Sequence, residues 1–90
     1  MHKEVALNYT LAVFKTRYAT LNFANLLKAN NVPMAIINTP SSISRTCGIS
    51  VKFLSAYFAK VQTLLGANLS NFAGFYSYTQ TLNGVNIFKL

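Results

Sequence analysis

Strand-like and helix-like segments alternate along this chain, and their order limits the available folds more than any single motif does. The segment Tyr9 to Lys15 is rich in β-forming residues and is followed by Thr16, a residue type favoured at helix N-caps. A mostly apolar stripe at helical spacing then predicts an amphipathic helix with a polar opposite side. The stripe consists of Ala19, Phe23, Leu26, Leu27 and Asn30, and the polar side of Arg17, Thr20, Asn25 and Lys28.

A second strand and a long connector are predicted after this helix. The helix is predicted to end at Asn30-Asn31, because Pro33 disfavours helical geometry just before it and Asn tolerates a left-handed cap. Met34 to Asn38 is short and almost wholly apolar, as a buried strand would be. Residues Thr39 to Thr46, TPSSISRT, are predicted to form a polar connector that leads to Cys47-Gly48.

The second half of the chain is predicted to begin with a strand and a helix. Ile49 to Phe53 alternates between apolar and polar residues, which places Ser50 and Lys52 on a solvated face. Ser55 is predicted to cap a second helix and Gly66 to end it. The apolar stripe of that helix would consist of Leu54, Phe58, Val61, Leu64 and Leu65.

Two further strands are predicted at the C-terminal end of the chain. Phe72 to Tyr78 is rich in β-forming residues and is predicted as the fourth strand. Asn83-Gly84 predicts a tight type I′ turn, followed by a short fifth strand at Val85 to Phe88.

The resulting β-α-β-β-α-β order is the split pattern of ferredoxin-like folds. The predicted class is therefore α+β, a ferredoxin-like βαββαβ sandwich with a four-stranded antiparallel sheet, both helices on one face and a short fifth strand added at the C-terminal end. The other face is expected to stay solvated or to pair with another molecule. We predict a flexible N-terminus over residues 1–8, one domain over 9–78, and a C-terminal tail or hairpin over 79–90.

Composition removes several classes of function. Eight Lys or Arg residues stand against one acid, Glu4, for a formal charge of +7. One carboxylate cannot perform the paired-carboxylate chemistry of glycoside hydrolases or aspartic proteases, and one His with one Cys cannot form a four-ligand zinc site in a monomer. No apolar run approaches the roughly 20 residues of a membrane span. We expect a cytoplasmic protein that needs no cofactor, with a reduced thiol at Cys47.

Cys47 is the residue with the most specific chemistry. Arg45 precedes it by two residues and Lys52 lies on the following strand, and nearby cations favour the thiolate, which is the reactive form of cysteine. Gly48 would let a partner approach closely. The alternative is a structural cysteine, because free Cys is among the most buried residue types. The hydroxyl groups that could donate to the sulfur are those of Ser44, Thr46 and Ser50.

The segment from Thr39 to Phe53 reads TPSSISRTCGISVKF and is preceded by LAVFKTRYATLNFANLLKANNVPMAIINTP. Together they resemble a small family of selenium/sulfur carrier-like proteins. That family has a strand ending in Phe, a helix with Leu-Leu near its end, a V-P or I-P strand leading into T-P, and a C-G-hydrophobic-Ser segment. Tyr9 to Tyr78 matches this layout in order and spacing, and the T-P to C-G stretch is its specific part.

The resemblance implies that Cys47 is the family's signature cysteine and holds a persulfide or selenopersulfide. A cysteine desulfurase-like donor would supply the atom, and an acceptor protein would take it. Ser41 stands where family members often have a basic residue after the Pro, so Arg45 is the candidate to supply that charge. The predicted site has Cys47 as the reacting group, with Pro40, Ser44, Arg45, Gly48, Ser50 and Lys52 around the bound atom.

Two other functions remain open at the level of sequence. The basic charge and a ferredoxin-like sheet suit RNA binding, with Phe14 as a base-stacking residue, although Ile49 to Phe53 lacks the aromatic signature of RNA-recognition motifs. The other is a module without chemistry, which forms a homodimer through the open sheet face or through Val85 to Phe88 added to an edge. His2 is expected in a frayed terminus rather than in a site.

Overall fold

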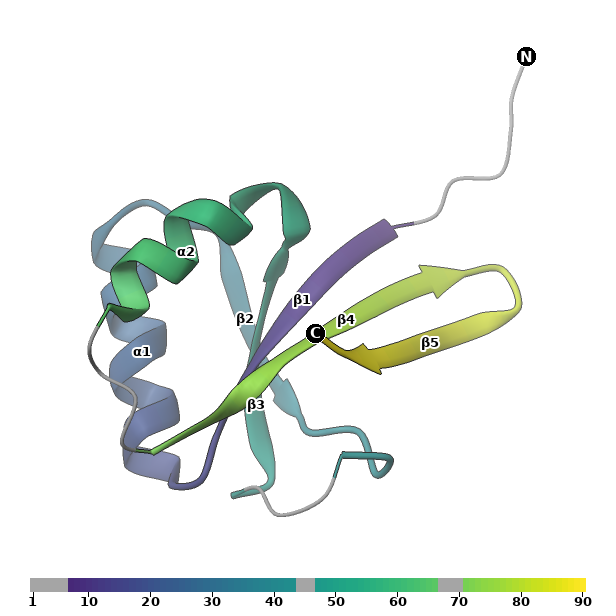
Figure 1. The fold of residues 1–90 in the computed structure, drawn as a ribbon, viewed down its shortest axis with the longest axis horizontal. Helices are drawn as coiled ribbons and strands as arrows, with labels where there is room; N and C mark the ends of the chain where they lie inside the picture. The colour runs from purple at the N-terminus through teal and green to yellow at the C-terminus, as the bar shows by residue number, and fades with distance from the viewer. Residues whose placement is uncertain (1–6, 44–46, 67–70) are drawn as a thin grey trace.

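The computed structural model describes residues 7–43, 47–66 and 71–90, and within them lie five strands and two α-helices (Figure 1). The strands pair in the order β2-β3-β1-β4-β5, and every pair of neighbours is antiparallel. This confirms the predicted α+β class with an open antiparallel sheet. The elements are β1 (Leu7–Phe14), α1 (Arg17–Ala29), β2 (Met34–Asn38), β3 (Ile49–Leu54), a 3-10 turn (Ser55–Tyr57), α2 (Phe58–Leu65), β4 (Phe72–Thr81) and β5 (Gly84–Lys89).

The ends of the helices follow from local capping, with one exception. Thr16 caps α1, because its Oγ1 accepts a hydrogen bond from Ala19 N at 3.1 Å. The helix ends as predicted, with Asn30 as its C-cap and Asn31 in the left-handed region at φ 60°. The prediction for Ser55 was wrong: it opens the 3-10 turn, and its Oγ lies 2.9 Å from Thr10 Oγ1 instead of capping α2.

Both helices pack on the same face of the sheet, where they share one apolar cluster with β1, β3 and β4. The first helix was predicted with Thr20 on its polar side, and this was wrong, because Thr20 is fully buried. Its burial follows from position, since Thr20, Phe23, Ala24 and Leu27 are the buried residues of α1. The buried members of the cluster are Ala12, Phe14, Phe23, Ala24, Leu27, Val32, Val51, Phe53, Val61, Leu65 and Phe75.

The opposite face of the sheet is covered at its centre, while Tyr9 and Lys52 on the same face stay partly exposed, so the expectation of a solvated face is correct only in part. Leu11 and Val13 of β1 are fully buried there, and Ile43 from the β2–β3 connector packs against them. Ser50 was expected to be solvated but is fully buried on this face, because the connector folds over it. The partly buried residues that complete this second cluster are Ile37, Ala73, Tyr76, Tyr78 and Ile87.

The two edges of the sheet are β2 and β5. β2 was predicted as a buried strand, but the strand order places it at an edge, and Ile36 is 43% exposed. The β4–β5 hairpin projects away from the helices (Figure 1). Its turn differs from the prediction: Thr81 pairs with Gly84, so Leu82 and Asn83 are the central residues, and neither has the positive φ of a type I′ turn.

Candidate functional site around Cys47

Cys47 lies two residues before β3 and is partly exposed. The two ends of the connector that carries it are joined by hydrogen bonds. Thr39 N donates to Gly48 O at 2.9 Å, and the hydroxyls of Thr39 and Ser50 lie 2.6 Å apart. The T-P and C-G parts of the motif are therefore neighbours in space, and the backbone bond at Gly48 places Cys47 next to the start of β3.

The sulfur of Cys47 contacts the first helix. Its Sγ lies 3.3 Å from Thr20 Oγ1 and 3.6 Å from Ile49 O. Thr20 is the fourth residue after the N-cap Thr16, and no acidic residue lies in the first turn of α1. The contact with Thr20 therefore places the sulfur beside the first turn of α1.

The Cys47 thiol and the Thr20 hydroxyl each have one hydrogen to donate, and together they make three hydrogen-bond contacts. Thr20 Oγ1 donates to Thr16 O at 3.0 Å, and the thiol donates to Ile49 O or to Thr20 Oγ1. When the sulfur loses its proton, the Thr20 hydroxyl can rotate and donate to it. Thr16 O still accepts from Thr20 N at 3.2 Å, so it keeps a partner after this rotation. The Thr20 hydroxyl can therefore donate to the sulfur while the backbone hydrogen bond from Thr20 N to Thr16 O stays in place.

Gly48, the residue after Cys47, has no side chain beside the sulfur. Its φ of +94° is in the region that favours glycine, and a Cβ built there would meet no described atom within 4 Å. Gly48 is exposed, so the residue that follows Cys47 presents only backbone. A side chain at this position would strain the turn and narrow the approach to the sulfur.

The other predicted site residues are only partly gathered around Cys47. Ser50 is near in sequence, but its hydroxyl is engaged by Thr39. Lys52 does not contact the sulfur: its Nζ lies 4.5 Å from the centre of the Tyr9 ring and 5.3 Å from that of Tyr78. Pro40 is partly buried, and its carbonyl oxygen accepts from Ile43 N at 3.0 Å. Ser44, Arg45 and Thr46 lie outside the described residues.

Thr20 is the site residue that the sequence analysis missed. The signal for it was present, because Thr20, Phe23, Ala24 and Leu27 follow the i, i+3, i+4, i+7 spacing of a buried helix face. Because the Thr20 side chain is polar, the sequence analysis placed it on the outer side of the helix instead. A hydroxyl in the first turn of a helix can donate a hydrogen bond to the carbonyl oxygen four residues earlier, as Thr20 does, and this bond allows the hydroxyl to be buried.

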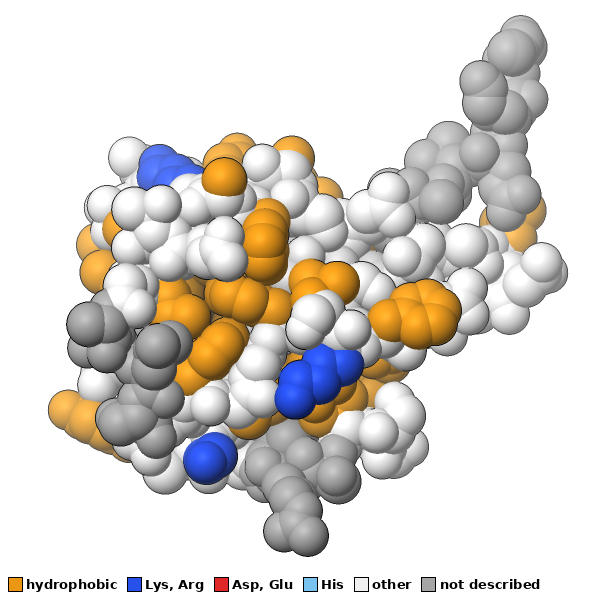
Figure 2. Space-filling view, viewed as in Figure 1, with side chains coloured by type: hydrophobic (Ala, Val, Ile, Leu, Met, Phe, Trp, Pro, Cys, Tyr) orange, Lys and Arg blue, Asp and Glu red, His pale blue; other side chains and the backbone are white. Residues whose placement is uncertain are grey.

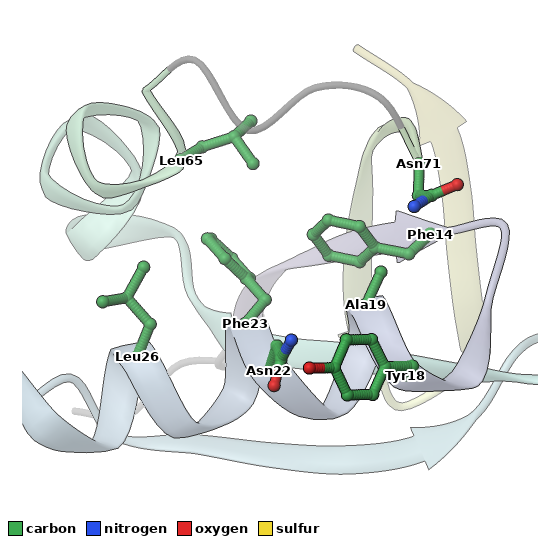
Figure 3. A pocket seen from close by; sticks show the side chains of 8 residues that line it. All are labelled: Phe14, Tyr18, Ala19, Asn22, Phe23, Leu26, Leu65 and Asn71. Atoms are coloured by element: carbon green, nitrogen blue, oxygen red, sulfur yellow. The ribbon is translucent and has the colours of Figure 1, made fainter.

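A separate hollow lies between the two helices and the end of β1 (Figure 3). Its volume is about 260 Å³, and Phe14 and Phe23 form part of its apolar lining. Neither Cys47 nor Thr20 lines it, so the hollow is not the space around the sulfur. Its lining residues are Phe14, Tyr18, Ala19, Asn22, Phe23, Leu26, Leu65 and Asn71.

The described residues contain no group of three or more His, Cys, Asp or Glu side chains that could hold a metal ion. None of their helices is long and apolar enough to span a membrane. The family model for proteins described as "Putative Se/S carrier protein-like" matches residues 8–77. No curated protein and no solved structure matches the chain. The matched range includes Cys47, Thr20 and the connector, and it ends inside β4.

Proposed function

Because the chain belongs to the Se/S carrier protein-like family, whose model covers residues 8–77, we propose that it carries a sulfur or selenium atom on Cys47 between two partner proteins. The observation that carries this proposal is the contact of a partly exposed thiol with a buried hydroxyl at the start of a helix, at 3.3 Å. The sulfur also lies one residue before Gly48, where an added Cβ would meet no described atom within 4 Å.

The transfer needs no cofactor on this chain. The Cys47 thiolate attacks the terminal sulfur of a persulfide on the donor, and the donor leaves as a thiolate. One S–S bond forms as another breaks, so the electrons balance without an oxidant. The proton given up by Cys47 passes to solvent or to the departing thiolate. The acceptor then attacks the outer atom on Cys47 in the same way, and selenium would follow the same steps.

Within this cycle Thr20 acts as a positioning residue. Its hydroxyl donates to the anionic sulfur before attack and to the Cys47 thiolate that is regenerated after delivery, which supports the geometry at 3.3 Å. Arg45 and Ser44, which lie outside the described residues, are proposed to contact the outer atom of the persulfide. Lys52 is left out of this role, because its ammonium group lies over aromatic rings.

The proposed donor is a cysteine desulfurase-like protein, and both partners are expected to present acidic surfaces. The chain has a net charge of +7, and charge complementarity speeds the encounter of two proteins more than it strengthens their complex. We place the cycle in the cytoplasm, where a single cysteine is kept reduced. We also infer a ferredoxin-like arrangement for the first four strands and the two helices, on the strength of the strand order β2-β3-β1-β4.

Intact-mass spectrometry tests the proposal directly. The protein is incubated with a cysteine desulfurase and either cysteine or selenocysteine, and we expect an adduct of about 32 Da for sulfur or about 80 Da for selenium on Cys47. Dithiothreitol should remove it. Absence of any adduct on the folded protein, while the desulfurase itself becomes charged, would contradict the carrier role.

Two variants serve as controls. Cys47→Ser removes the only cysteine and should abolish the adduct. Ser41→Cys in the Cys47→Ser background places a thiol on an exposed position of the same connector, away from Thr20. We expect it to accept the atom much more slowly. Equal rates for both thiols would show that the surroundings of Cys47 contribute nothing.

RNA binding is not proposed, because no observation favours it. Phe14, the expected stacking residue, is 3% exposed and lies between Phe23 and Phe72. Ile43 packs against Leu11 and Val13 at the centre of the face opposite the helices. The basic side chains visible in Figure 2 are separated by uncharged surface.

A further inference from the structure

The two edges of the sheet differ in how they are protected. β2 has five residues, and Pro33 and Pro40 lie just beyond its two ends. Both prolines lie outside Met34–Asn38, so they hinder extension of this short strand at its ends. β5 has six residues and no flanking proline, and it exposes Val85 by 44% and Phe88 by 65%. Among the described residues, no strand pairs with the outer side of β5.

Charge indicates what can occupy this edge. Residues 71–88 contain no charged side chain, although the whole chain has a net charge of +7. An acidic partner would be drawn to the lysines and arginines elsewhere on the molecule. A second copy of this chain is repelled by those same residues, and that repulsion is weakest at a strand whose single charged residue, Lys89, lies at its end. The distribution of charge thus favours a second copy over an acidic partner at β5.

The backbone of β5 is oriented for such pairing. Leu90 N donates to Phe75 O at 3.0 Å, so the amides of even-numbered residues face β4. In an antiparallel sheet the next residues face the other way, and the amides and carbonyls of Val85, Ile87 and Lys89 therefore point away from β4. These three residues also place their side chains on one face of the sheet.

We propose that two copies of this protein pair along β5 in an antiparallel, two-fold symmetric arrangement centred on Ile87. This register pairs all three residues whose backbone groups point outward, and it brings Ile87 opposite its counterpart. Val85 then faces Lys89 of the second copy, and Phe88 faces Asn86 of that copy. The two lysines lie at opposite ends of the interface, so no like charges meet.

The dimer leaves the proposed carrier site free. Three strand spacings separate β3 from β5, and each is roughly 4.8 Å, so Cys47 lies at the far side of the sheet from the interface. The family match ends at residue 77, and β5 lies outside it. The dimer therefore does not rest on the carrier role, and one of the two proposals can fail without the other.

The oligomeric state is measured first, by light scattering or sedimentation between about 1 µM and about 1 mM, the range in which small interfaces associate. We expect the mass to rise with concentration from 9.9 kDa toward twice that value. A protein that stays monomeric up to the highest concentration overturns the inference.

A charge pair of variants then tests the register. Val85→Lys places two lysines opposite each other at both ends of the interface and should raise the dimer Kd by about tenfold. Val85→Glu removes the same apolar surface but places a carboxylate opposite Lys89, and its Kd should stay close to that of the parent. Ile36→Lys and Ile36→Glu on β2 are matched controls, because Ile36 is 43% and Val85 44% exposed. An effect of the Ile36 pair equal to that of the Val85 pair overturns the assignment to β5.

Disulfide cross-linking independently tests whether Ile87 lies at the centre of the proposed β5–β5 pairing. In the Cys47→Ser background, Ile87→Cys should form an intermolecular disulfide under mild oxidation, since directly paired Cα atoms are about 5.5 Å apart. Asn86→Cys, one residue away, faces Phe88 of the second copy and should cross-link poorly. Equal cross-linking of the two variants, or none with either, contradicts the proposed register.

Discussion

At the scale of single residues, the proposed chemistry depends on the pair Thr20 and Cys47. Thr20 is fully buried, so its hydroxyl must have partners inside the protein, and it has two, at 3.0 Å and 3.3 Å. Its spacing with Phe23 was readable from the sequence. Its contact with Cys47, 27 positions later, was not, because it depends on how α1 packs against the sheet.

Thr20→Val removes the hydroxyl and keeps the shape of the side chain. We expect alkylation of Cys47 by iodoacetamide at neutral pH to slow by about tenfold, because a hydrogen bond to an ion contributes about 1.5 kcal/mol. Thr20→Ser keeps the hydroxyl and should react at close to the parental rate. The rate is measured on folded protein, with circular dichroism as the check. A Thr20→Ser variant as slow as Thr20→Val would indicate a packing role only.

At the scale of elements, the connector between β2 and β3 has a structural role besides carrying Cys47. Its residue Ile43 is 7% exposed and covers Leu11 and Val13. The sequence predicted the helices and strands well, because periodicity and caps are local. It did not predict the covered second face, because Ile43 sits among Ser, Thr and Pro residues and only the fold brings it over β1.

Ile43→Ala tests this role of the connector. The truncation opens a cavity over β1, and the free energy of unfolding should fall by about 2–4 kcal/mol in urea titrations. Ile36→Ala on the β2 edge removes the same atoms from a position that is 43% exposed, and it should cost less than about 1 kcal/mol. Similar losses for the two variants would mean that the connector does not cover the sheet in solution.

At the scale of the whole molecule, charge and apolar surface are distributed separately. Five of the basic residues that the structure describes lie on the body of the protein, while the hairpin of β4 and β5 has only Lys89. The count of charges could be taken from the sequence. Their division between the body and an edge strand with a single lysine required the strand order, which places β5 on the outside.

Sulfur transfer from a protein donor should depend strongly on salt. With both proteins dilute, we expect the rate of Cys47 persulfidation to fall about tenfold between about 0.05 M and about 0.5 M NaCl, because salt screens the attraction between oppositely charged surfaces. Alkylation by neutral iodoacetamide under the same conditions is the reference and should change little. A transfer rate that is independent of salt contradicts electrostatic docking.

The pairing proposed along β5 would also limit how far the sheet can grow. The remaining sheet edges of such a dimer are two copies of β2, a strand of five residues with Pro33 and Pro40 beyond its ends. A strand this short offers few backbone groups to a further copy, so two-fold pairing along β5 would favour a closed dimer over an open-ended filament.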